Sequence, residues 1–192
     1  MYTLVRRLGI GLFAGAIALA AVPASAQEVS LGYQWQRISV DDESESLPLG
    51  FNIDVAGPIS PTLDIVGQLD WSRKSESETI FGTSVDTTIS LTTFGGGIRW
   101  NSRANPSMTP FVQALFGATR TSFSCEVGGV DCDDFIGDDT SSTDPMFQIG
   151  GGVAIPMGAW SAVGQIDYRR IFAEDEGANS IRLVFGVRLG IR

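Results

Sequence analysis

The sequence predicts an all-β protein, an eight-stranded antiparallel up-and-down barrel that crosses a membrane. Eight segments alternate between large apolar residues and small or polar residues with a period of two, and no helical pattern follows residue 26. The links between these segments alternate between short and long. Closure of an antiparallel sheet removes its two edge strands, and eight strands form a barrel whose interior side chains just fill.

The first 26 residues have the pattern of a secretory signal peptide. Arg6 and Arg7 precede an apolar run over residues 8–22, and small residues follow at Ala24 and Ala26. The run is rich in Ala and Gly and is shorter than the ~20 apolar residues of a membrane-spanning helix. We therefore expect cleavage after Ala26, with residues 1–26 as the signal peptide and residues 27–192 as one barrel domain.

The alternating segments differ in regularity. They cover residues 29–35, 47–55, 63–71, 88–100, 110–118, 147–155, 160–168 and 181–191. In the second segment, Leu47 shares a phase with the apolar residues that follow it. In the fourth segment, Ile89 and Leu91 are out of phase with the later apolar residues, which predicts a β-bulge near Thr92 and Thr93. The fifth segment has apolar residues in both phases, so its outward face is left open.

The long links are acidic. They cover residues 41–46, 74–86, 124–144 and 173–179, and they contain 17 of the 22 acidic residues. Because they follow every second strand of an up-and-down array, all of them are expected as loops at one end of the barrel. The short links and both ends of the domain are expected at the other end.

Alternation alone is compatible with two kinds of barrel. In a soluble periplasmic barrel of the lipocalin kind, the apolar phase would line a cavity for a lipophilic ligand; in a membrane barrel it would face lipid. The polar phase here is rich in Gly, Gln, Asp, Arg and Ser, and the only lysine is Lys74. Aromatic residues lie toward the segment ends, where they would form interfacial girdles: Tyr33, Trp35, Trp71, Trp100, Trp160 and Tyr168. These features favour the membrane barrel.

The stretches "FGGGIRW", "QIGGGV" and "GQIDYRR", together with the signal peptide and the loop pattern, carry a family resemblance over residues 27–192. The chain resembles the small eight-stranded outer-membrane barrels of the OmpA/OmpX type in Gram-negative bacteria. The resemblance implies a location in the outer membrane, contact with its lipid bilayer and with the outer-membrane assembly machinery, and a monomer. We expect a non-enzymatic structural, envelope or surface-interaction role, with a narrow pore for small solutes or ions as the alternative.

The polar phase brings both signs of charge to the predicted lumen. The expected network consists of Asp54, Asp70, Arg99, Asp167, Arg169, Arg182 and Arg188. Such charges are tolerated inside a protein when they are paired and hydrogen-bonded. They could form an ion-conducting pore or a plug of ion pairs, and the narrow lumen of eight strands favours the plug.

The longest acidic link holds both cysteines, Cys125 and Cys132. In an exported chain, two cysteines this close predict one disulfide. Carboxylates in the same link are weak candidates for a Ca²⁺ or Mg²⁺ site, although their spacing does not match an EF-hand: Asp131, Asp133, Asp134, Asp138 and Asp139.

The composition excludes several functions. Removal of Arg6 and Arg7 leaves 11 basic against 22 acidic residues, a net charge of about −11, which argues against nucleic acid as a partner and against binding of anionic lipid through charge. The chain has no histidine, so Ser-His and Asp-His catalysis is excluded. The glycine runs 95–97 and 150–152 lie within strand patterns rather than before a helix, so they are not phosphate loops. We expect no cofactor, and no residue pattern identifies a surface ligand.

Overall fold

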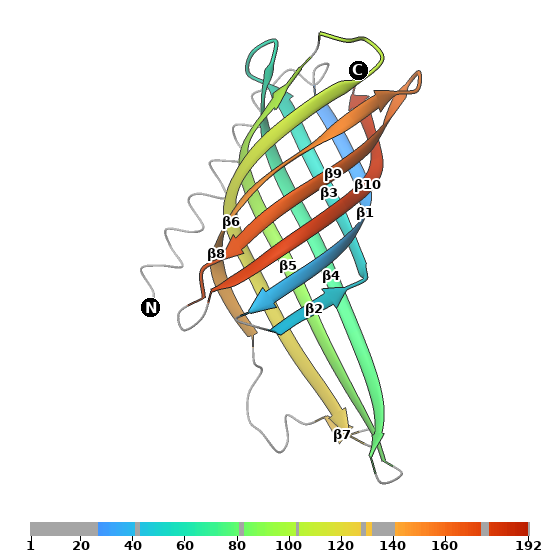
Figure 1. Cartoon of the computed structure of the whole chain (residues 1–192), viewed down its shortest axis with the longest axis vertical. Helices are drawn as coiled ribbons and strands as arrows, with labels where there is room; N and C mark the ends of the chain where they lie inside the picture. The colour runs from blue at the N-terminus through green and yellow to red at the C-terminus, as the bar shows by residue number, and fades with distance from the viewer. Residues whose placement is uncertain are drawn as a thin grey trace.

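The structure, a computed structural model, describes residues 27–40, 43–80, 83–102, 104–127, 130–131, 141–173 and 177–191. Within these ranges all regular secondary structure is β-strand (Figure 1). The strands are β1 (Gln27–Val40), β2 (Glu43–Leu47), β3 (Leu49–Pro58), β4 (Leu63–Ile80), β5 (Thr83–Asn101), β6 (Thr109–Val127), β7 (Val130–Asp131), β8 (Ser141–Pro156), β9 (Trp160–Ile171) and β10 (Ala178–Ile191). No helix among the described residues is long and apolar enough to span a membrane.

Eight of these strands form a closed antiparallel barrel. Neighbours in sequence are neighbours in the sheet from β1 through β3, β4, β5, β6, β8 and β9 to β10, and β10 pairs with β1 from Gln27↔Ile191 to Ser39↔Asn179. Strand β2 continues β3 beyond Pro48, and the two-residue strand β7 pairs only with β6. The predicted eight-stranded up-and-down barrel is therefore confirmed.

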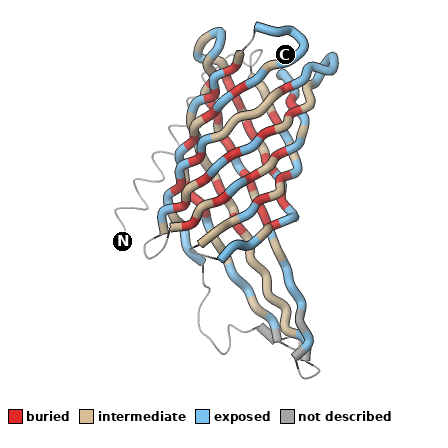
Figure 2. Tube along the Cα trace, viewed as in Figure 1, coloured by how far each residue is buried: buried red, intermediate tan, exposed pale blue. Residues whose placement is uncertain are grey.

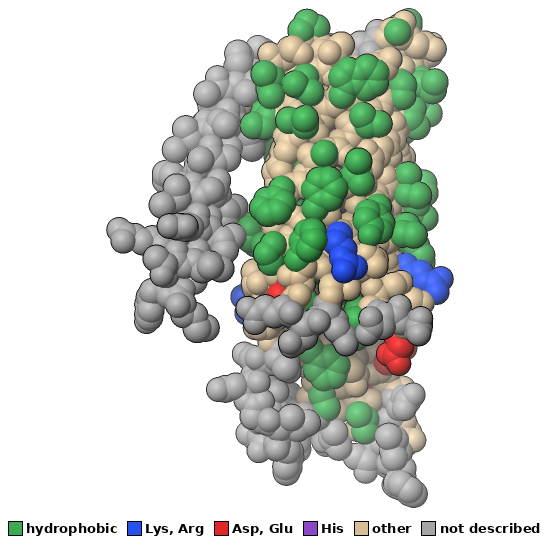
Figure 3. All heavy atoms as spheres, turned by 60° about the vertical axis from the view of Figure 1, so that its left-hand side comes forward, with side chains coloured by type: hydrophobic (Ala, Val, Ile, Leu, Met, Phe, Trp, Pro, Cys, Tyr) green, Lys and Arg blue, Asp and Glu red, His purple; other side chains and the backbone are tan. Residues whose placement is uncertain are grey.

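The two faces of the barrel wall have opposite chemistry. Buried and exposed residues alternate along each strand (Figure 2), as the period of a pleated strand requires. The outward residues are apolar and exposed, for example Phe116 at 65% and Phe185 at 61%, whereas Arg99, Arg169 and Arg182 point inward and are fully buried. Hydrophobic side chains cover the outer wall in Figure 3. A lipocalin-like soluble barrel has the reverse arrangement, so that alternative is wrong.

The predicted girdle aromatics lie in the outward phase of the wall. Tyr33, Trp100, Trp160 and Tyr168 are each at least 40% exposed. Trp100 and Trp160 lie at the short-turn end of the barrel, one residue before the end of β5 and at the start of β9. The other four lie toward the long-loop end. The two groups therefore border the apolar belt on both sides, as expected for a wall in contact with lipid.

Several segments expected as loops are strands. β4 and β5 pair without interruption to Ile80↔Thr83, and β6 pairs with β5 as far as Val127↔Val85. Residues 43–46 belong to β2, and residues 141–144 begin β8. The loop assignment was wrong because backbone pairing does not require an apolar face. Polar side chains pair across these strands instead, for example Ser75 and Thr88 with 3.0 Å between their hydroxyl oxygens.

These longer strands form a three-stranded extension, residues 75–80, 83–88 and 124–127, which projects from the long-loop end of the barrel (lower end of Figure 1). The pairing of β3 with β4 stops at Leu49↔Arg73, and that of β8 with β6 stops at Ser141↔Ser122. Beyond these pairs the extension stands clear of the closed wall.

The expected bulge in β5 is absent, and one lies elsewhere. Thr92 and Thr93 pair one for one with Trp71 and Asp70. Ile89 and Leu91 are out of phase with the outward residues because both point into the lumen, where they pack against other apolar side chains.

The extra residue lies at the junction of β2 and β3. The pairs Tyr33↔Phe51 and Gln36↔Leu47 leave two residues of β1 opposite three residues that include Pro48. Proline lacks the N–H that a regular ladder needs, which suits it to a bulge. The bulge turns Leu47 inward, where it is 1% exposed, so its assignment to the outer face was wrong.

Candidate functional site

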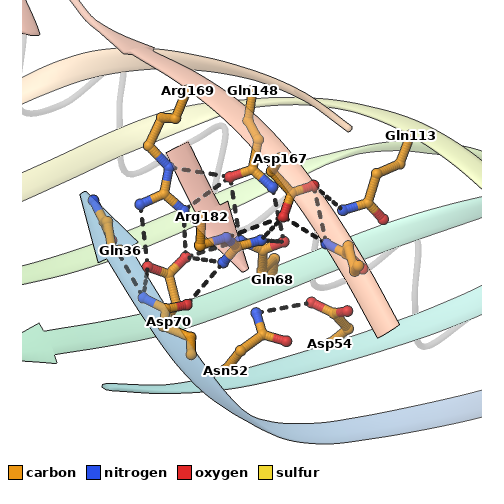
Figure 4. Close-up of polar contacts among 12 residues, drawn as sticks. Gln36, Asn52, Asp54, Gln68, Asp70, Gln113, Gln148, Asp167, Arg169 and Arg182 are labelled. Carbon is orange, nitrogen blue, oxygen red and sulfur yellow. Dashed lines mark hydrogen bonds and ion pairs between the residues drawn. The ribbon is translucent and has the colours of Figure 1, made fainter. Parts of the chain in front are cut away.

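The lumen contains a dense group of charged and amide side chains toward the long-loop end. We call this group the loop-side cluster, and Figure 4 shows most of it. Its members are Gln34 of β1, Gln68 and Asp70 of β4, Gln148 of β8, Asp167 and Arg169 of β9, and Arg182 of β10. All are buried, and they come from five different strands, so they can meet only when the sheet is closed.

Arg182 has a partner for every N–H direction of its guanidinium group. Nε and Nη2 donate to Asp167 Oδ2 at 3.0 and 2.7 Å, and Nη1 donates to Asp70 Oδ2 at 3.0 Å. The remaining donors reach the amide oxygens of Gln34 and Gln68 at 3.1 and 3.0 Å. Burial of a cation is tolerated when it is paired in this way.

Arg169 binds the other side of the same carboxylate. Its Nη1 and Nη2 donate to Asp70 Oδ1 and Oδ2 at 3.1 and 2.6 Å, which is the bidentate geometry that a planar guanidinium favours. Its Nε and Nη2 also donate to Gln148 Oε1, and Nη1 donates to the hydroxyl of Thr93 at 2.8 Å. Asp70 thus joins two arginines. Each of these arginines also donates hydrogen bonds to a glutamine amide oxygen on another strand.

A second pair of arginines lies nearer the short-turn end. Arg99 and Arg188 each stack on the ring of Phe111 with 4.9 Å from the guanidinium carbon to the ring centroid. We call these two arginines the turn-side pair. Nη2 of Arg99 donates to Asp54 at 3.0 Å and to Gln113 at 2.7 Å, and Arg188 lies 3.5 Å from Glu28. Among the described residues Arg99 Nη1 and Arg188 Nη2 have no hydrogen-bond partner.

An apolar layer lies between the loop-side cluster and the long-loop end of the lumen. It consists of Leu47, Leu91, Met146, Ile171 and Ala178, with Ile38, Val40 and Ile89 packed against it. This cap separates the cluster from the water beyond the barrel. A low local dielectric strengthens the ion pairs beneath it.

Two glycines make room for these groups. A Cβ atom at Gly150 would lie 2.0 Å from Asp167 Oδ1, and a Cβ atom at Gly95 would lie 2.6 Å from Met146 Cε. These two positions of the glycine runs therefore admit a carboxylate of the cluster and a side chain of the cap.

The lumen has little free space. A void of about 10 Å³ touches Ser30, Asn52, Asp54 and Gln165, and this volume is roughly what one water molecule needs. Fixed ion pairs below an apolar cap can hold the strands together and seal the interior. A lumen filled in this way disfavours the passage of a hydrated ion.

The seven charged residues assigned to the lumen from the sequence all lie there. The structure joins Asp70, Asp167, Arg169 and Arg182 directly, and it places Asp54, Arg99 and Arg188 in the separate turn-side region. Seven further polar residues of the lumen were not predicted to lie there: Gln36, Asn52, Ser72, Thr93, Gln113, Glu28 and Asp64. Their inward phase was the available signal.

Most of the residues predicted to form the disulfide and the cation site in the longest acidic link lie outside the described residues. Cys132, Asp133, Asp134, Asp138 and Asp139 lie outside the described residues, so the disulfide with Cys125 and the cation site stay predictions. Of Asp131 only the backbone, in β7, is described. Within the described ranges no group of three or more His, Cys, Asp or Glu could hold a metal ion. The signal peptide also lies outside them.

Comparison with known proteins gives one family and several similar structures. The sequence profile described as "Outer membrane protein beta-barrel domain" matches residues 9–189. The structure of Neisserial surface protein A is similar at a TM-score of 0.64, with 16% identity over 85% of this chain and 96% of that chain. Ail of Yersinia pestis, crystallised with the heparin analogue sucrose octasulfate, gives 0.57, with 18% identity over 86% and 99%. Among curated proteins there was no match.

Proposed function

Because the chain belongs to the outer membrane protein β-barrel domain family, we propose that it is a non-enzymatic, monomeric anchor whose extension and acidic loops contact cationic molecules outside the cell. The protein is an outer-membrane barrel. The proposal concerns what this barrel displays.

The observation that carries the proposal is the three-stranded extension. Its strands continue past the last residue pairs of β3 and β8, so the extension projects beyond the end of the barrel wall. It is polar, and its carboxylates include Glu76, Asp86 and Glu126, all outside the apolar belt. A rigid sheet with a low cost of ordering is a better contact surface than a free loop.

Charge sets the kind of partner. The long links hold most of the acidic residues of a chain with a formal net charge of −9, so they favour cationic molecules and repel polyanions. Ail was crystallised with a sulfated heparin analogue. We expect this chain, in contrast, to bind no heparin.

Two measurements test the proposal. Protease treatment of whole cells should cleave within residues 121–145, and cells that display the protein should bind poly-lysine beads but not heparin beads. A triple variant Glu76→Gln, Asp86→Asn, Glu126→Gln should weaken poly-lysine binding, whereas a variant of the outward wall, Val187→Leu, should leave it unchanged. Equal binding of all three proteins, or protection of residues 121–145 in intact cells, would contradict the proposal.

A narrow pore is the alternative function, and the packed lumen argues against it. An apolar cap and a filled ion-pair cluster present both a steric and a dielectric barrier to ions. We expect no single-channel steps when the folded protein, verified by heat-modifiable gel mobility, is added to planar bilayers. Reproducible steps would support the pore.

A further inference from the structure

Four arginines occupy equivalent positions on the outer wall. Each shares its phase with an apolar residue two positions earlier, which is exposed or half-buried in three strands and is the buried Ala118 in β6, so each is the first charged side chain beyond the apolar belt. The pairs, each within one strand, are Trp35 and Arg37 in β1, Trp71 and Arg73 in β4, Ala118 and Arg120 in β6, and Tyr168 and Arg170 in β9.

Strand pairing relates the four to one another with offsets of two to four residues, which is the stagger that tilted strands of a closed barrel give to residues at one level. Arg37 lies opposite Ile181 of β10, which lies opposite Tyr168, two residues before Arg170. On the other side, Thr92 of β5 lies opposite both Trp71 and Arg120. On the face shown in Figure 3, Lys and Arg side chains gather at the lower border of the hydrophobic belt. The four residues, which we call the arginine ring, therefore follow the long-loop border of the belt.

The arginine ring is not neutralised by carboxylates of the described residues. The guanidinium groups donate to neutral oxygens: Arg37 to Ser44 at 2.6 Å, Arg73 to Ser75 at 3.1 Å and Thr88 at 3.4 Å, Arg120 to Ser141 at 3.4 Å, and Arg170 to Asn179 at 2.8 Å. The ion pairs of the same part of the chain belong to the lumen arginines and to Lys74. In a chain with 22 acidic and 13 basic residues, this separation is unexpected.

A groove in the outer wall adjoins the ring. It has a volume of about 330 Å³ and is lined by Phe51, Leu69, Asp70, Trp71 and Thr92. The Phe51 and Trp71 rings lie 5.7 Å apart, centroid to centroid. Arg73 follows Trp71 in the same outward phase, so an apolar chain in this groove would bring its polar end to the guanidinium group.

These observations fit a phosphate that arrives within the membrane plane. A guanidinium group binds phosphate oxygens with two parallel hydrogen bonds. The acidic links beyond the ring disfavour a free anion from the water, whereas a lipid reaches the ring along the wall. We propose that Arg37, Arg73, Arg120 and Arg170 bind the phosphate groups of lipid headgroups in the leaflet at the long-loop end.

The test measures quenching of tryptophan fluorescence by brominated lipids. The protein is folded into phosphatidylcholine vesicles that contain brominated phosphatidic acid or, in a parallel series, brominated phosphatidylcholine. Trp35 and Trp71 lie next to the ring and report lipids bound there. Brominated phosphatidic acid should quench the wild-type protein more strongly than brominated phosphatidylcholine does. We expect one interfacial arginine to contribute as much as a basic residue near an anionic surface, so each Arg→Gln substitution should reduce this preference about fivefold.

Two further variants distinguish the ring from simple charge. The fourfold Arg→Lys variant should keep part of the preference, because lysine retains the charge but lacks the planar fork. Lys74→Gln removes a neighbouring cation that is already paired with Glu45 and Glu76, and it should change nothing. The four single Arg→Gln variants test the inference even if a variant with all four substitutions does not fold.

Two outcomes would overturn the inference. One is a phosphatidic acid preference that survives in every Arg→Gln variant. The other is loss of the preference when inorganic phosphate is added, which would indicate a site for free anions. The inference rests on membrane insertion and not on the surface contacts proposed above. A protein that binds no poly-lysine beads can still select phosphatidic acid, so the two failures are distinguishable.

Discussion

The two arginine sites of the lumen differ in how they neutralise buried charge. In the loop-side cluster, Arg169 and Arg182 share the carboxylate of Asp70, and all their N–H groups point at oxygens. In the turn-side pair, Arg99 and Arg188 share an aromatic ring, and each has one nitrogen without a partner among the described residues. One barrel thus stabilises cations through a shared carboxylate at one level, and at another through a shared π-system together with one carboxylate for each arginine.

The difference follows from what surrounds each site. The loop-side cluster lies under an apolar cap, where an unpaired charge is costly, so full pairing is required. The turn-side pair packs on Phe111, which clusters with Ala154 and Val163, and two of its nitrogens have no hydrogen-bond partner among the described residues. We therefore expect the loop-side cluster to contribute more to stability and to tolerate less change.

The largest effect is expected from Asp70→Ala. It leaves Arg169 without a carboxylate and Arg182 with only Asp167, and removal of one partner of a buried ion pair costs about 3 to 5 kcal/mol. The free energy of unfolding by urea in lipid vesicles measures it. Asp54→Ala is the matched change at the turn-side pair and should cost less, because Arg99 keeps Gln113 and Phe111. Equal losses in the free energy of unfolding of the two variants would contradict the expected difference between the two sites.

A smaller effect is expected from Gly150→Ala. The new methyl group would meet Asp167 and the carbonyl oxygen of Ile166, and overpacking of this kind costs roughly 1 to 3 kcal/mol. Gly164→Ala is the control, since a Cβ atom there has open space within 4 Å. The same urea measurement applies to both, and a loss at Gly164 as large as that at Gly150 would contradict the assignment.

Phe111→Leu tests the turn-side pair itself. Loss of the ring removes two cation–π contacts, which together contribute about 1 to 2 kcal/mol in a desolvated site. A double-mutant cycle with Arg188→Met isolates this coupling from the change in apolar packing. A coupling energy of zero would mean that Phe111 serves only as apolar filling.

The smallest effect concerns an ion pair outside the membrane. Hydrogen bonds that Lys74 donates to the carboxylates of Glu45 and Glu76 raise the pKa of Lys74 above its ordinary 10.5. The favourable contribution of a group whose pKa is raised is complete below the unfolded value and is lost as the pH rises through the folded one. The extension should therefore loosen only above about pH 10.5. Because Lys74 is the only lysine, one side-chain signal from ¹³C-lysine reports its titration.

A matched pair of variants accompanies that titration. Glu45→Gln should move the midpoint of Lys74 down toward 10.5, whereas Glu126→Gln, on β6, should not. A midpoint at or below 10.5 in the wild-type protein would mean that this exposed ion pair does not form.

The amino-acid sequence by itself determined the strands, their order and the two faces of the wall. A period of two is a local property, and the lipid-facing residues from Ile181 to Leu189 can be identified without any partner. The alternation of short and long links likewise indicated which links lie at the same end of the barrel. The inward phase contained all seven lumen charges for the same reason.

Only the tertiary structure decided which of those charges meet. Asp70 and Arg182 are far apart in the sequence, and their contact depends on barrel closure and on the stagger of the strands. The bulge at Pro48, the inward turn of Leu47 and the apolar cap depend on pairing register, which the alternation does not contain. The extension was missed because polar strands have no apolar period, and their pairing is held by backbone hydrogen bonds that every sequence can make.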